Sequence, residues 1–185
     1  MNYHHRLKLI VLLVGAVWLS ALAQSDIGPA PPADHSLIYA LNQENKLAPL
    51  PFEIATTPLK TELVAKSTTT SYLELKGEHA PTVLPGNAGI FVFVTDRGGA
   101  HPPLIVWLTP HRGSRRVTAI AERGRAGFAI VTSEIVRPVP HGLAKNGDEV
   151  FMELRPRASL MPGEYAIIGN DLTRVATFRV VSAVN

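Results

Sequence analysis

The stretch from Gly89 to Pro110 constrains the fold of this 185-residue chain more than any other. Residues 90–95 alternate aliphatic side chains with two phenylalanines, and residues 104–108 alternate leucine and valine with isoleucine and tryptophan. Both faces of each run are therefore apolar, which is typical of strands that are covered on both sides. The Gly98-Gly99 turn between the runs predicts that the two strands pair as a hairpin.

The rest of the chain continues this β pattern in shorter runs. About seven to nine short strands, with turn signals every ~8–12 residues, predict an all-β, antiparallel β-sandwich of immunoglobulin-like architecture. The sequence Lys145-Asn146-Gly147-Asp148 predicts one hairpin turn, because Asn-Gly tolerates positive φ. Asp34 is placed to cap a short helix, which we expect near residues 35–43.

The N-terminus has the pattern of an export signal. Arg6 and Lys8 precede an apolar run that ends in the small-x-small sequence Ala21-Leu22-Ala23. The run is shorter than the roughly 20 residues of a membrane-spanning helix, which favours a cleaved signal peptide over an uncleaved anchor. We therefore expect a periplasmic, extracellular or cell-surface protein with no stable membrane insertion after cleavage. The expected organisation is a signal peptide at 1–23, a Pro-rich tether at 24–34 and a single β-sandwich domain at 35–185.

The composition of the chain excludes several kinds of site and partner. The chain has no cysteine, which excludes disulfides, a thiol nucleophile and the lipid-anchored cysteine of bacterial lipoproteins. Loss of Arg6 and Lys8 with the signal peptide leaves 16 Lys and Arg against 15 Asp and Glu. The exported chain is therefore almost neutral, and with export this argues against a nucleic-acid partner.

Arginines cluster in one part of the chain, on a predicted strand and in the turns at its two ends. Such a cluster fits an anionic glycan, a lipid headgroup or an acidic protein surface, or else a solvated edge that discourages aggregation. If Val117 begins an inward-facing strand, Arg115 takes the inward register and Arg116 points outward. The candidate partner-binding residues are Arg112, Arg115, Arg116, Arg123 and Arg125.

No sequence motif indicates catalysis or metal binding. The five histidines after the signal peptide form no His-x-His or His-x₃-His pair, so we expect no metal site and no cofactor. Gly-x-Ser-x-Gly, His-Glu-x-x-His and a phosphate-binding glycine loop are absent from the sequence. We therefore expect no catalytic residues and a protein that is not an enzyme.

The segment 160–168, Leu-Met-Pro-Gly-Glu-Tyr-Ala-Ile-Ile, resembles the hairpin entry of uncharacterised exported bacterial β-sandwich modules with immunoglobulin-like folds. The resemblance covers these nine residues and the general strand order of the second half. It implies a fold and a compartment, and it carries no functional residue.

These features predict a non-enzymatic accessory, assembly or adhesion module of a bacterial cell envelope. The expected partner is another envelope protein, held by edge-strand or surface pairing, or a surface glycan. One alternative is a module that binds carbohydrate or a small anionic ligand. Another is a hydrolase whose Ser, His and acid come together from distant loops.

Overall fold

The computed structural model describes residues 28–42, 44, 46–55, 60–65, 68–95, 102–121, 128–169 and 174–182. The predicted signal peptide, residues 1–23, lies outside them. Residues 31–185 form one compact unit, which is an all-β sandwich as predicted. Apart from one 3₁₀ turn at Thr132–Glu134, the described residues contain strands and loops. None of them belongs to a helix long and apolar enough to cross a membrane.

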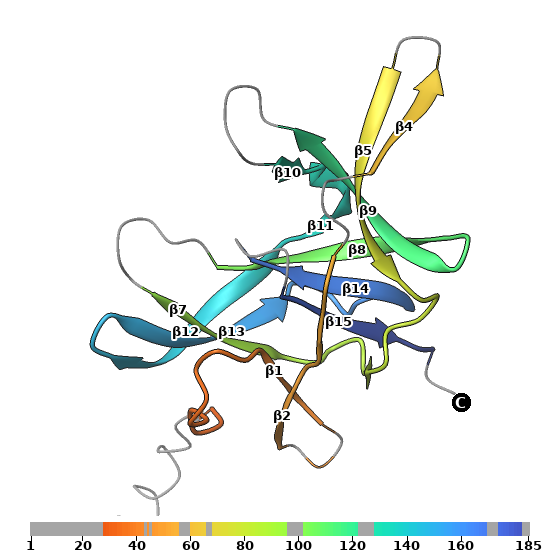
Figure 1. Cartoon of the computed structure of the whole chain (residues 1–185). Helices are drawn as coiled ribbons and strands as arrows, with labels where there is room; N and C mark the ends of the chain where they lie inside the picture. Colours follow the sequence, from red (N-terminus) through yellow and green to blue (C-terminus); the bar gives the residue numbers. More distant parts are fainter. Residues whose placement is uncertain are drawn as a thin grey trace, which may run out of the picture. The chain divides into compact units, whose positions relative to one another are not determined.

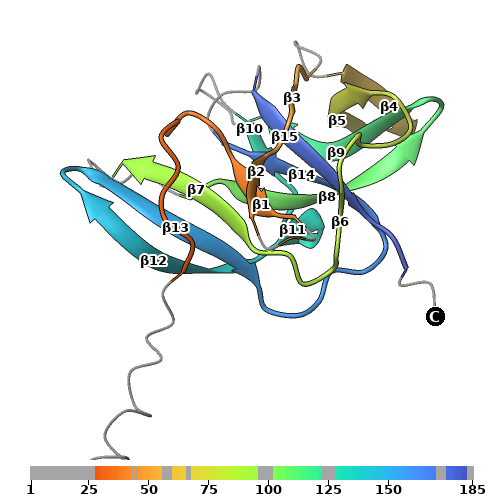
Figure 2. The same cartoon turned by 90° about the horizontal axis from the view of Figure 1, so that it is seen from below.

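The first sheet has five antiparallel strands, and β12, β13 and β7 run side by side in it (Figure 2). Its order is β12 (Pro138–Asn146), β13 (Glu149–Pro156), β7 (Ile90–Thr95), β1 (Tyr39–Leu41) and β2 (Leu47–Pro49). The predicted Asn-Gly turn joins β12 to β13, with Asn146 opposite Glu149 and Gly147 at a φ of 59°.

The second sheet has ten strands, several of them only two or three residues long, so the described strands outnumber the seven to nine expected. Its main order is β3 (Phe52–Glu53), β15 (Val175–Val180), β14 (Gly163–Ile168), β8 (Leu104–His111), β9 (Ser114–Ala121), β5 (Thr68–Lys76) and β4 (Lys60–Ala65). Three short strands lie beside this path: β10 (Phe128–Ile130) on β9, β11 (Ile135–Val136) on β8, and β6 (Val83–Leu84) on β15. The β6–β15 pair is parallel.

The second sheet bends back on itself after β8. Figure 1 shows β8, β14 and β15 between β7, β12 and β13 on one side and β4, β5 and β9 on the other. One face of β8, β14 and β15 packs against the first sheet in a core that includes Ile105, Ile167 and Phe178. The other face packs against β5 and β9 in a second core. Alternate residues of the middle strands therefore enter different cores.

The two apolar runs are covered on both faces, but the predicted hairpin between them is wrong. Strand β7 pairs with β13 and β1, whereas β8 pairs with β14, β9 and β11. Each run lies between two neighbours of its own sheet, and the two runs face each other across the first core. The Gly-Gly segment that suggested the hairpin lies outside the described residues.

The short helix expected near 35–43 is also absent, because this part of the chain joins the first sheet. Asp34 accepts hydrogen bonds from the Ser36 N–H at 2.9 Å and the Ser36 hydroxyl at 2.7 Å, which closes a turn. These bonds hold the pKa of Asp34 below its usual value. Residues 39–41 then pair with β2, which buries Tyr39 and Ala40 on opposite faces of the sheet. Strand pairing thus overrides a local capping signal.

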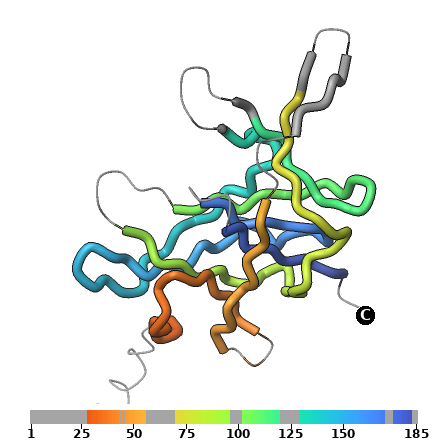
Figure 3. The backbone as a smooth tube through the Cα atoms, in the orientation of Figure 1, coloured from red at the N-terminus to blue at the C-terminus, as the bar shows by residue number. Residues whose placement is uncertain are grey.

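The chain crosses between the two sheets after β5. The yellow-green tube in Figure 3 follows this segment, residues 77–89, from the end of β5 through β6 to the start of β7. Gly77 begins the crossing with a φ of 84°, in the left-handed region that favours glycine. Residues of this crossing contact a buried glutamate and line a pocket at the edge of the sandwich.

The buried side chain of Tyr165 makes the stability of the fold depend on pH in the alkaline range. Its ring packs in the first core and its hydroxyl donates to the Met161 carbonyl at 2.7 Å. Burial raises the pKa of Tyr165 from 10.0 to about 12. The folded state therefore favours the neutral phenol, and this contribution is complete below pH 10 and is lost as the pH rises through about 12.

We expect tyrosinate absorbance to show a step near pH 12 from Tyr165. The free energy of unfolding should decrease as the pH approaches this step. The Tyr165→Phe variant is the control, because it lacks that step. A Tyr165 that ionises at its ordinary pKa would contradict the burial argument.

Candidate functional site

The candidate arginines do not form one surface. Arg115 is 1 % exposed, whereas the next residue, Arg116, points outward and lies 4.0 Å from the centre of the Tyr72 ring. Arg112 is exposed in the turn between β8 and β9, with a φ of 44°. The predicted register of Arg115 and Arg116 is confirmed, since adjacent residues of a strand face opposite sides. Arg123 and Arg125 lie outside the described residues.

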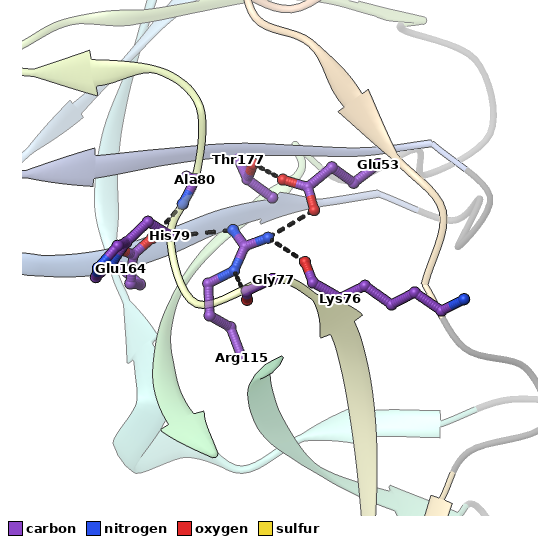
Figure 4. Close-up of polar contacts among 8 residues, drawn as sticks. All are labelled: Glu53, Lys76, Gly77, His79, Ala80, Arg115, Glu164 and Thr177. Atoms are coloured by element: carbon purple, nitrogen blue, oxygen red, sulfur yellow. Dashed lines mark hydrogen bonds and ion pairs between the residues drawn. The ribbon is translucent and has the colours of Figure 1, made fainter. Parts of the chain in front are cut away.

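Arg115 is the centre of a buried ionic network, shown in Figure 4. Its Nε donates to the Gly77 carbonyl at 2.9 Å. Its Nη2 donates to the Lys76 carbonyl at 2.9 Å and forms an ion pair with Glu53 at 2.6 Å. The guanidinium is therefore engaged in contacts inside the fold, and a partner cannot reach it while β9 stays in place.

A second carboxylate completes this network. Glu164 on β14 is 7 % exposed and lies 3.9 Å from Arg115 Nη1. One of its oxygens accepts from the Ala80 N–H at 2.8 Å, and the other contacts His79 Nδ1 at 2.9 Å. Glu53 in turn accepts a bond from the Thr177 hydroxyl. The network thus ties the start of the crossing segment to four strands of the second sheet, β3, β9, β14 and β15.

Sequence reasoning missed the acidic members of this network. Glu164 shares a strand face with Ala166 and Ile168, which are apolar. These two apolar neighbours on its face are a usable signal for an inward carboxylate. Nothing local marks Glu53, which is 62 residues from Arg115 in the sequence.

Two histidines are paired with carboxylates. His79 contacts Glu164, and His35 contacts Glu149 at 2.8 Å while its ring stacks on Phe93 with a centroid distance of 3.9 Å. Among the described residues, no three His, Asp or Glu side chains gather as a metal site requires. Nor does a described serine or threonine hydroxyl bond to either imidazole. Each pair connects distant segments, which no sequence spacing reveals.

A pocket of about 740 Å³ opens between the two sheets at the edge where β2 and β6 lie. We call it the edge groove. Its lining comes from β1, β2, the crossing segment, the loop before β14 and the end of β15. The lining residues are Ala40, Leu41, Asn42, Ala48–Leu50, Thr82–Asn87, Ser159, Leu160, Pro162 and Val180–Ser182.

The groove exists because the strands on either side of it are short. Pro49 ends β2, and Pro85 follows β6, so neither strand extends far enough to close the edge of the sandwich. Its floor is part of the first core, including Ala40, Leu84 and Val180. Gly86 lets the segment approach closely, since a Cβ there would lie 2.5 Å from the Leu160 carbonyl oxygen.

The groove is electrically neutral. Among the residues that the structure describes, its lining contains no Asp, Glu, Lys, Arg or His, and its polar side chains are serines, asparagines and one threonine. Burying a charge without a partner is costly, so the groove favours an uncharged, apolar occupant. In the described part of the lining, the hydroxyls of Ser159 and Ser182 have no acid or base beside them.

The wall of the groove and the buried ionic network belong to the same segment. Ala80, which donates to Glu164, is followed within two residues by Thr82, the first lining residue from the crossing segment. The network therefore holds one wall of the groove in position. The chain matches no protein-family model, no curated protein and no solved structure, so the function rests on this geometry alone.

Proposed function

We propose that this protein is an exported, non-enzymatic contact module of a bacterial envelope that binds an apolar, uncharged segment of another envelope protein in the edge groove. The observation that carries the proposal is the groove itself, an apolar pocket between two short edge strands whose described lining residues are all uncharged. Exposed apolar surface of this kind is typical of a binding site.

The proposed contact surface is the edge groove and does not include the arginines. Arg115 is buried and paired, and Arg116 is engaged with Tyr72, so neither presents a free guanidinium. The predicted protein–protein contact is kept, with apolar burial in place of charge as its source of affinity. Binding of an anionic glycan or a small anionic ligand finds less support, because the described lining of the groove offers such a ligand no cation.

A charge placed in the groove tests this proposal. Ala48 pairs with Ala40 across β1 and β2 and so faces the same side, toward the first core. The Ala48→Asp variant is expected to weaken partner binding at least tenfold, because a carboxylate must then be desolvated or exclude the partner. The measurement is crosslinked capture from envelope extract, with the partner quantified by mass spectrometry.

Ala144→Asp is the matched control. Ala144 lies on β12, at the opposite edge of the same sheet, and it is also an alanine of an edge strand. We expect this variant to retain the partner, with both variants melting close to the wild-type protein. Equal loss of the partner in both variants, or no loss in Ala48→Asp, would refute the groove as the contact site.

A further inference from the structure

One residue of β6 turns its backbone groups away from the sheet. Arg179 lies opposite Val83, and the Arg179 N–H donates to the Thr82 carbonyl at 2.8 Å. In a parallel pair, a residue bonds to the two neighbours of the residue opposite it, so Thr82 and Leu84 face β15. The N–H and C=O of Val83 therefore point to the outer side of β6, and neither has a partner among the described residues.

The outer edge of β2 offers fewer backbone hydrogen-bonding groups to an added strand. The Asn42 N–H donates to the Lys46 carbonyl and the Leu50 N–H to the Ile38 carbonyl, so the alternation of an antiparallel pair turns Leu47 and Pro49 outward. Pro49 has no N–H, which removes a donor from the outer edge of β2. A chain that lies along the groove therefore finds an adjacent donor and acceptor on β6 and an interrupted edge on β2.

We propose that the occupant of the edge groove is an extended peptide segment that adds to β6 as a further strand and pairs with both backbone groups of Val83. This inference rests on the function proposed above and specifies its ligand. In a strand, alternate side chains point to opposite faces, so every second side chain of the segment enters the neutral groove and must be apolar and uncharged.

Backbone chemistry favours a peptide over a hydrocarbon chain. An acyl chain would fill the apolar floor, but it would cover the N–H and C=O of Val83 without bonding to them. An unpaired backbone group removed from water costs free energy comparable to a lost hydrogen bond. A peptide strand supplies an acceptor and a donor at the spacing that β6 presents.

The test separates backbone pairing from apolar burial at the same residue. A phage-displayed random-peptide library is selected against the full-length exported protein, and a selected peptide is measured by calorimetry against two variants. Val83→Pro removes the outward N–H but keeps the Thr82 carbonyl and the Leu84 N–H that bind β15. Val83→Ala keeps the N–H and removes most of the side chain, so it controls for lost apolar contact.

We expect the selected peptides to alternate uncharged apolar residues and to bind Val83→Pro about three- to tenfold more weakly, while Val83→Ala binds nearly as well as wild type. Methylation of the peptide nitrogen that donates to Val83 should weaken binding similarly. Protection of the Arg179 amide from hydrogen exchange, equal in both variants, checks that β6 stays paired to β15.

Three results would overturn the inference. If Val83→Pro binds as well as wild type while Ala48→Asp does not bind, the groove is the contact site but no strand is added. If no peptide is selected and a fluorescent fatty acid binds instead, the occupant is a lipid chain. If neither probe binds, the groove is not a binding site and the proposed function fails with the inference.

Discussion

Replacing Arg115 with methionine is expected to lower the free energy of unfolding by about 3–5 kcal/mol. Methionine fills much of the same volume, but it leaves the buried Glu164 and the partly buried Glu53 without their shared cation. It also removes the donors to the Lys76 and Gly77 carbonyls. Breaking one partner of a buried ionic network is costly because the remaining charges stay desolvated. Urea denaturation of the two proteins measures the difference.

Arg116→Met is the matched control for this prediction. Arg116 is the adjacent residue of the same strand, but it lies half-buried over the Tyr72 ring. A cation–π contact at such a site contributes about 0.5–1 kcal/mol, so the control should lose no more than about 1 kcal/mol. Similar losses for the two variants would show that the ionic network does not stabilise the fold as its geometry implies.

Arg115 and Arg116 also show which parts of the site could be predicted from the sequence. Alternation along a strand places Arg115 inward and Arg116 outward, and both positions are confirmed. The counter-charges of Arg115 come from β3 and β14, and only the tertiary pairing of β15 with both of these strands brings them together. A charged cluster in the sequence therefore indicates a surface, although one of its members, Arg115, is a buried structural ion.

The edge groove could not be predicted from the sequence, for a different reason. It forms between β2 and β6, which are short strands of different sheets, and it depends on where prolines stop each of them. The prolines are visible in the sequence as breaks, but which edges meet is decided by strand order. The predicted hairpin between residues 90–95 and 104–108 fails for the same reason, because two-faced strands carry no signal for choosing their neighbours.

The second large effect is expected in β7, where truncation on either face of the strand should destabilise the fold. Ile90 packs in the core between the sheets, and Phe91 packs on the opposite face of the first sheet with Tyr39 and Phe151. Both side chains are almost fully buried. We expect Ile90→Ala to cost about 2–5 kcal/mol and Phe91→Ala about 3–5 kcal/mol, from lost apolar burial and the cavity left behind.

This result distinguishes a strand covered on both faces from the common case with one solvated face. Val139→Ala on β12 is the control, because Val139 is 47 % exposed at the edge of the same sheet and should change stability by no more than about 0.5 kcal/mol. If Phe91→Ala behaved like Val139→Ala, the outer face of the first sheet would be open to solvent. The segment from His35 to Tyr39, whose rings join Phe93 and Phe91 there, would then contribute nothing to the fold.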